Sequence, residues 1–381
     1  MAADPARTGR SDAGAAARRL DAMRHLLHAR RVAESLQLGT QPSVRNSALA
    51  GLQAALAAAI CVPLLALSPW PHLVGFASLG ALVALFGRFA PRRRRAGIVL
   101  QCAFWQTFAV FAMSATAWLG WPRAAQLALL AASCGFYLLI CFRQRFGAPG
   151  PLIFIFAVGA SMTGALDAAQ VAERTLATAG AALVSWLICV ASEALRHPPT
   201  PQRPLPQEPE RPLGELAFMA ARVATAALVV VFASHVLRLN HPAWAAMGAV
   251  AVMQGSHLHI SMHRALQRMA GTLVGAAQAW LLLVQQPSIW PIIAAIVLLQ
   301  ILVEIVIGVN YGIAQALVTP MALLMTHLAS PSAAGAAMAP ERVAETVLGA
   351  IVGMGIAVAL SNAEDRRTLA RHHGSSLPDG R

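Results

Sequence analysis

The stretch IWPIIAAIVLLQILVEIVIGVNYG, from Ile289 to Gly312, decides the fold class of this chain. Up to Val306 it carries one charged side chain, Glu304, and about 20 apolar residues in a helix are enough to cross a hydrocarbon core of about 30 Å. The whole chain agrees, because 57% of its 381 residues are hydrophobic, 12% are charged and the mean hydropathy is +0.60. A soluble domain needs more charge to cover its surface. The sequence therefore predicts an all-α, polytopic membrane protein.

Similar apolar runs recur along the sequence and predict about twelve transmembrane helices. The run at 242–256 is short, which indicates a helix that is tilted, broken or shielded by its neighbours. The first run begins too far from Met1 for a signal peptide, so we expect a resident membrane protein. The runs lie at about 47–67, 72–90, 98–120, 124–142, 150–166, 175–192, 217–236, 242–256, 266–285, 289–308, 311–329 and 343–361.

The distribution of arginine predicts the orientation. Arginines gather on the cytoplasmic side of membrane proteins, and with both termini inside, few of the 29 basic residues fall in outer segments. Those few are Arg123, Arg174, Arg238 and Arg342. We therefore expect a multi-pass protein of the bacterial inner membrane with both termini cytoplasmic. The basic run PRRRRAG (Pro91–Gly97) then serves orientation, which argues against nucleic acid as a partner.

Two pairs of similar segments indicate an internal duplication. LGALVALFG (Leu79–Gly87) precedes MGAVAVMQG (Met247–Gly255) by 168 positions, and AERTLAT (Ala172–Thr178) precedes PERVAET (Pro340–Thr346) by the same offset. Each half holds about six apolar runs, an even number, so both halves run in the same direction. The sequence predicts two parallel six-helix repeats about an axis along the membrane normal.

Composition divides the chain into five parts. The Pro-rich linker favours an extended spacer, with a proline-rich recognition ligand as the alternative. The basic N-terminal segment suits either an interfacial helix or a solvated tail. The parts are the cytoplasmic N-terminal segment 1–46, the first membrane repeat 47–195, the linker 196–213, the second membrane repeat 214–362 and the cytoplasmic tail 363–381.

The segment RALQRMAGTLVG carries the candidate binding residues Arg264, Arg268, Gly271, Thr272 and Gly275. The small residues let helices approach closely, and Thr can bond across the contact. The two arginines lie one turn apart at the predicted N-terminus of a helix, where free N–H groups attract anions and Arg adds a bidentate clamp for a carboxylate. We expect Arg268 to hold the charge of an organic anion. The alternative is that it only anchors the helix on the inner side.

Histidines and cysteines suggest no metal site. His257, His259 and His263 have no Cys or carboxylate nearby to complete a ligand set, so we interpret them as loop residues. The five cysteines lie in apolar runs and are expected to be buried and unpaired. No Walker A motif and no nucleophile–base pair appears, so we expect neither an enzyme nor a cofactor.

Glu304 is a candidate for proton coupling. It lies about 8 Å from the predicted midplane, inside a half-thickness of about 15 Å. Intramembrane carboxylates usually face a cavity or a partner and often relay protons. The alternative is that the side chain snorkels to the inner surface.

In each half, an acidic residue followed by a basic residue stands at the start of a helix that is predicted to begin on the outer side of the membrane. Glu173 and Arg174 do so in the first half, and Glu341 and Arg342 in the second. We interpret them, with Glu345, as structural ion pairs or helix caps.

Beyond these residues, the second half resembles the fusaric acid resistance (FUSC) and aromatic acid exporter family of membrane transporters. The resemblance is carried by HPAWAAMGAVAVMQ, RALQRMAGTLVGA, GVNYG and ERVAETVLGAIVG, in that order. It adds Asn310 and Tyr311 to the expected substrate site. The first half lacks the Arg-x-x-Gly-Thr element, and the linker stands where larger members carry a soluble domain.

The resemblance implies an exporter of organic anions, such as aromatic carboxylates, driven by the proton gradient. Distant similarity to plant malate-permeable channels makes an anion channel the second hypothesis, and a non-transporting membrane scaffold is the third. The expected partners are a small organic anion and the lipid bilayer, with a homodimer and a periplasmic adaptor protein as further options.

Overall fold

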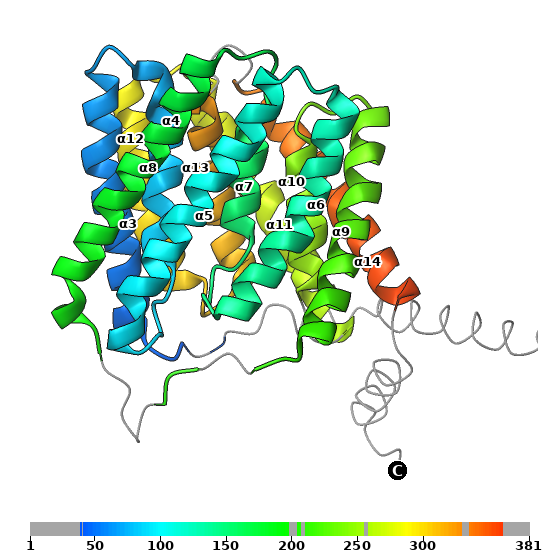
Figure 1. The fold of residues 1–381 in the computed structure, drawn as a ribbon, viewed down its shortest axis with the longest axis horizontal. Coiled ribbons are helices and arrows are strands. Elements are labelled where there is room, and N and C mark those ends of the chain that lie inside the picture. The colour runs from blue at the N-terminus through cyan, green and yellow to red at the C-terminus, as the bar shows by residue number, and fades with distance from the viewer. Residues whose placement is uncertain are drawn as a thin grey trace, which may run out of the picture.

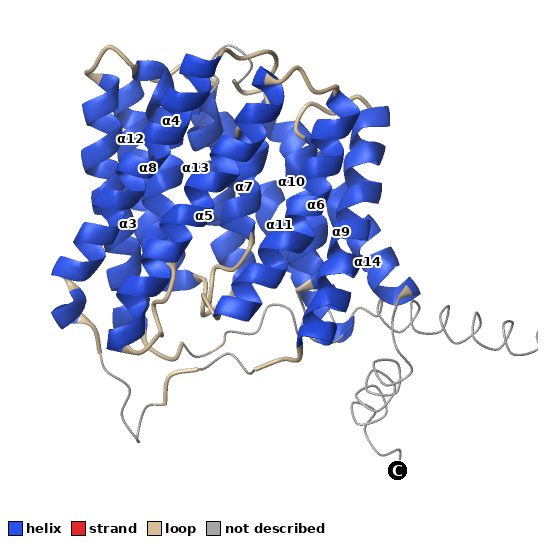
Figure 2. Cartoon of the chain, viewed as in Figure 1, coloured by secondary structure: helices blue, strands red, loops and turns tan. Residues whose placement is uncertain are grey.

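A computed structural model describes residues 39, 41–197, 204–206, 210–254, 258–329 and 335–360. In these residues every regular element is a helix and none is a strand (Figure 2). The helices run up and down side by side, and the start of α3 (Val44–Ala66) and the end of α14 (Met338–Ala359) lie at the same, lower side (Figure 1). The all-helical prediction is confirmed.

Within the described residues, eight helices are long and apolar enough to cross a membrane, so the chain is a polytopic membrane protein. α11 (Leu258–Leu283) is as long but more polar, because it carries Arg264 and Arg268. The eight are α3, α5 (Arg92–Trp118), α6 (Arg123–Gln144), α8 (Ala168–Ala191), α9 (Leu213–Val236), α12 (Ile289–Val306), α13 (Tyr311–Ala329) and α14.

Three apolar runs form short helices instead of full spans. They are α4 (Val74–Ala81), which continues in a 3₁₀ turn, α7 (Leu152–Ala160) and α10 (Pro242–Met253). The run predicted at 150–166 is helical over only nine residues, about 14 Å at 1.5 Å per residue. Pro151 sets its start, because proline suits the beginning of a helix but not its interior. Every residue of α4 and α10 is buried, so protein rather than lipid surrounds them.

The packing of α3–α8 has a counterpart in the packing of α9–α14. α4 packs against α3 and α8, and α10 packs against α9 and α14. We call α3–α8 the first set of helices and α9–α14 the second set. Between the two sets, α3 packs against α12, and α6 packs against α9. The short helix α7 contacts α10, and α4 contacts α13. Short helices from both sets therefore line the junction between them.

Individual contacts also recur 168 positions apart. The guanidinium of Arg174 lies 5.0 Å from the centre of the Phe76 ring, and that of Arg342 lies 5.0 Å from the Trp244 ring. Close backbone approaches recur in the same way, with Gly80, Thr178 and Ala182 in the first set corresponding to Gly248, Thr346 and Ala350 in the second.

Candidate functional site

A cavity of about 650 Å³ lies at the lower end of the junction, and we call it the lower vestibule. Both sets of helices line it: Arg88 and Phe142 come from the first, and Arg264, Gln267 and Tyr311 from the second. Two of these five side chains are cationic.

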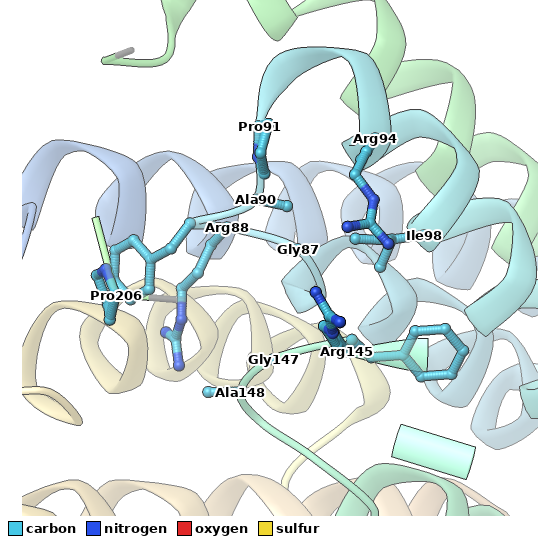
Figure 3. Close-up of a pocket in the computed structure, with 12 residues that line it drawn as sticks. Gly87, Arg88, Ala90, Pro91, Arg94, Ile98, Arg145, Gly147, Ala148 and Pro206 are labelled. Carbon is cyan, nitrogen blue, oxygen red and sulfur yellow. The ribbon is translucent and has the colours of Figure 1, made fainter. Parts of the chain in front are cut away.

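A second cavity of about 360 Å³ adjoins the lower vestibule and shares Arg88 with it. Figure 3 shows Arg94 and Arg145 beside it, with Pro206 of the linker at its edge. Arg145 forms an ion pair with Glu210, also from the linker. Three arginines thus line this cavity, and because Arg145 and Arg88 are paired with Glu210 and Glu304, Arg94 contributes the positive charge that no ion pair balances in the described residues.

At the opposite end of the junction, the upper vestibule has a volume of about 510 Å³. His241 and Trp244 line it, their rings stacked 4.0 Å apart and 8° from parallel. Nδ1 of His241 lies 2.9 Å from a carboxylate oxygen of Glu341. Burial lowers the pKa of His241, so the ring is neutral at neutral pH. Among the described residues that line this vestibule there is no arginine, so it is less basic than the lower one.

The helices α7 and α10 extend between the two vestibules. Trp244, at the start of α10, lines the upper one, and Gln254, just after α10, lines the lower one. Gly159 of α7 lies so close to Ala243 that an added Cβ would overlap the alanine methyl group. α7 and α10 are thus in close contact at the upper vestibule, and a solute that crosses between these helices must move this seam.

Arg268 lies inside the protein between the vestibules and is 3% exposed. Its Nη1 donates to the Tyr311 hydroxyl at 3.0 Å and to Oε1 of Gln315 at 3.3 Å, while its Nε has no partner. Gln315 in turn donates to Thr272 at 3.4 Å. All these contacts are neutral, so nothing in the described part of the chain neutralises the charge of Arg268 by an ion pair.

Arg342 is also buried, 2% exposed, in the first turns of α14. Among the described residues its guanidinium makes no hydrogen bond or ion pair, and it lies 5.0 Å from the centre of the Trp244 ring. Glu345, one turn further, accepts instead from the backbone N–H of His241 at 2.8 Å and caps the start of α10. The structure thus places Glu345 as a helix cap, but it shows no ion pair for Arg342.

Unlike Arg268 and Arg342, the buried arginines of the first set of helices have carboxylate partners. Arg95 lies 3.4 Å from a carboxylate oxygen of Glu193, and Arg196 lies 2.7 Å from the other oxygen. Arg88 is paired with Glu304. A buried charge needs a partner of opposite sign, and within the described residues Arg268 and Arg342 are the fully buried arginines that have none.

Glu304 is 1% exposed and forms its ion pair with Arg88, from the loop before α5. The pair joins the two sets of helices, and Arg88 also lines the lower vestibule. Glu304 therefore does not snorkel to the surface.

The small residues of α11 form a close seam with α13. A Cβ added at Gly271 would overlap the carbonyl oxygen of Gly312, and one at Gly275 would lie 2.6 Å from the carbonyl oxygen of Ala316. Asn310 caps α13, because its Oδ1 accepts from the N–H groups of Gly312 at 2.8 Å and Ile313 at 3.1 Å. The structure thus gives these glycines and Asn310 packing and capping roles, and Tyr311 a contact with Arg268.

The other outer residues form local contacts. Glu173 lies 3.1 Å from His72, and Arg174 donates to Thr163 at 3.1 Å. His257 and the side chain of His259 lie outside the described residues, whereas His263 lines the lower vestibule. No group of metal-ligating side chains occurs in the part of the chain that could be searched.

The interpretation of the sequence missed three contributors to the site. Gln315 and Trp244 reach Arg268 and Arg342 from other helices, and Arg88 reaches Glu304 across 216 positions. A polar residue in an apolar run, such as Gln315, was the one signal available.

Residues 226–356 match a family described as fusaric acid resistance protein-like. This region is therefore similar to a fusaric acid resistance protein-like domain. The matched region runs from the end of α9 through most of α14, and so contains both Arg268 and Arg342. No significant match was found among curated proteins or solved structures.

Proposed function

We propose that this protein exports small organic anions, such as aromatic carboxylates, across a bacterial inner membrane, with coupling to the proton gradient. The observation that carries this proposal is Arg268, a buried guanidinium with only neutral partners beside Tyr311 of the lower vestibule. A carboxylate would supply the missing charge. The name of the matched domain refers to fusaric acid, itself an aromatic carboxylic acid, which supports this substrate class.

The direct test is flux in proteoliposomes with benzoate and its neutral analogue benzamide. We expect saturable benzoate flux that follows an imposed pH gradient, and none with benzamide. Benzoate currents that depend only on voltage and the anion gradient would favour a channel. Absence of flux with a panel of organic anions would favour a scaffold.

The twelve helices form, in our proposal, two parallel six-helix repeats with the lower side cytoplasmic. The recurrence of the contacts of Arg174 and Arg342 with aromatic rings 168 positions apart supports the duplication. Arginines at the lower ends of helices support the orientation.

Two leucine positions test that orientation. Leu119 directly follows α5, which ends on the upper side, and Leu213 begins α9, which starts on the lower side (Figure 1). These side chains are 59% and 64% exposed. We expect a membrane-impermeant maleimide added to intact cells to label Leu119→Cys, and to label Leu213→Cys only after permeabilisation. The five native cysteines are buried, so the parent chain gives a low background. The opposite pattern would reverse the orientation.

Proton coupling is assigned to Glu304 as part of this proposal. A proton on Glu304 would break its pair with Arg88 and free that arginine toward the lower vestibule. We expect Glu304→Gln to remove the response of benzoate flux to a pH gradient. It should also cost about 3–5 kcal/mol of stability, because it leaves Arg88 buried without its partner.

The double variant Arg88→Gln/Glu304→Gln is expected to regain much of that stability, since it removes both charges. Glu215→Gln is the control, because it removes a carboxylate on α9 that is 47% exposed and lies outside the proposed coupling pair. If Glu304→Gln keeps full activity and an unchanged response to pH, Glu304 has no coupling role.

A further inference from the structure

Arg342 carries a charge that the described structure does not balance. Its Nε and Nη1 are buried and have no hydrogen-bond partner. Contact with the Trp244 face stabilises a cation only modestly, whereas removing a charged group of this size from water carries a much larger penalty even after relaxation. The aromatic contact alone therefore leaves most of that penalty uncompensated.

Other donors without partners lie beside Arg342. Thr346 is one turn further along α14, and its buried hydroxyl has no partner. Nε of Arg268 also has none, and Arg268 and Arg342 lie on α11 and α14, two helices that pack against each other. Two like charges that share a buried region repel unless an anion lies between them.

The charges in this region sum to one positive charge, which one negatively charged ligand would balance. Arg268 and Arg342 contribute two positive charges and Glu345 one negative charge; one carboxylate oxygen of Glu345 accepts at the start of α10, and the other, Oε2, is buried without a hydrogen-bond partner. One carboxylate would neutralise the cluster and supply two acceptor oxygens for the free N–H and O–H groups.

We propose that Arg342 and Thr346 form, together with Arg268, a buried two-arginine site for the carboxylate of an organic anion. The proposal rests on the transport function above and names Arg342 as its second binding residue, in place of a structural role. Arg268 is joined to Tyr311 of the lower vestibule, and Arg342 lies against Trp244 of the upper one. The site thus lies between the two cavities, where a solute that crosses the α7–α10 seam would pass.

The first set of helices provides a matched control. Arg174 lies over Phe76 at the same 5.0 Å as Arg342 over Trp244, but it is less buried and has Thr163 as a hydrogen-bond partner. Arg174→Gln therefore removes an equivalent cation–aromatic contact without touching the proposed site.

The test measures benzoate and benzamide binding to the purified full-length protein by calorimetry, together with thermal unfolding in the absence of ligand. We expect Arg342→Gln to weaken benzoate binding about ten- to a hundredfold, as loss of a charge-assisted contact does. Thr346→Val should weaken it less, and Arg174→Gln should leave it within about twofold of wild type.

A combination of readouts separates a binding role from a structural one. If Arg342 binds the ligand, its charge is unpaired in the ligand-free protein, so removing that charge should not destabilise the fold. Ligand-free Arg342→Gln is then expected to unfold at or above the wild-type temperature, while its affinity for benzoate falls. Lower unfolding temperature with unchanged affinity would overturn the proposal. If Arg342→Gln does not fold, Arg342→Lys keeps the charge, and wild-type affinity in that variant would equally overturn it.

The outcomes also distinguish this proposal from the proposed function. Loss of benzoate binding in Arg268→Gln but not in Arg342→Gln would leave the transport function standing and remove the second arginine. Equal binding of benzoate and benzamide, or no binding of either to the wild type, would refute both.

Discussion

Arg268→Lys is expected to weaken carboxylate binding about ten- to a hundredfold, nearly as much as Arg268→Ala. Lysine keeps the positive charge but loses the planar fork that holds two carboxylate oxygens at once. A charge-assisted hydrogen bond contributes about 1.5–3 kcal/mol, and about 1.4 kcal/mol corresponds to one decade of affinity. Tyr311 and Gln315 hold Nη1 in place, so an ammonium group cannot restore the same geometry.

Membrane level and orientation separate this binding role from an anchor. Both are expected to stay normal in Arg268→Lys, because the positive charge that directs topology is retained. Arg222→Lys, on α9, is the control for an arginine outside the site. The binding role would be contradicted if Arg268→Lys shows wild-type benzoate flux and Arg268→Ala is misoriented or absent from the membrane. Arg268 would then have only an anchoring role.

Much of the fold could be predicted from hydropathy, because a membrane interior demands long apolar helices. An α-helix occurs in each of the twelve predicted runs. What hydropathy did not predict is where a run stops being helical. α7 covers only part of its apolar run, because burial by neighbouring helices satisfies a short segment that lipid alone would not tolerate.

The candidate site could be predicted only in part. The spacing of Arg268 and the small residues after it indicated that α11 closely approaches another helix. This could be predicted because the residues concerned are close together in the sequence. The interpretation of Glu341 and Arg342 as ion-pair or capping residues named no partners, and the two do not pair with each other, because consecutive helical residues do not face each other. Glu341 contacts His241 instead. Long-range contacts such as Arg88 with Glu304 depend on how distant helices pack, which local patterns do not encode.

Two glycines on α14 test how closely the central helices are packed. Gly349 lies against α10, where an added Cβ would overlap the carbonyl oxygen of Ala245, whereas Gly355 has open space around it. Alanine favours a helix over glycine by about 1 kcal/mol, so Gly355→Ala is expected to raise stability slightly. At Gly349 the same methyl group must push the α10 backbone away, and overpacking of this kind costs about 1–3 kcal/mol.

Gly349→Ala is therefore expected to lower the thermal unfolding temperature in detergent and to abolish benzoate flux, because α10 carries Trp244 against Arg342. Gly80→Ala is expected to be destabilising as well, since a Cβ there would overlap the carbonyl oxygen of Thr178. Its effect tests whether both halves depend on the same close approach. Equal stability of the Gly349→Ala and Gly355→Ala proteins would show that α10 and α14 do not meet as closely as described, and the placement of Arg342 beneath Trp244 would then lose its support.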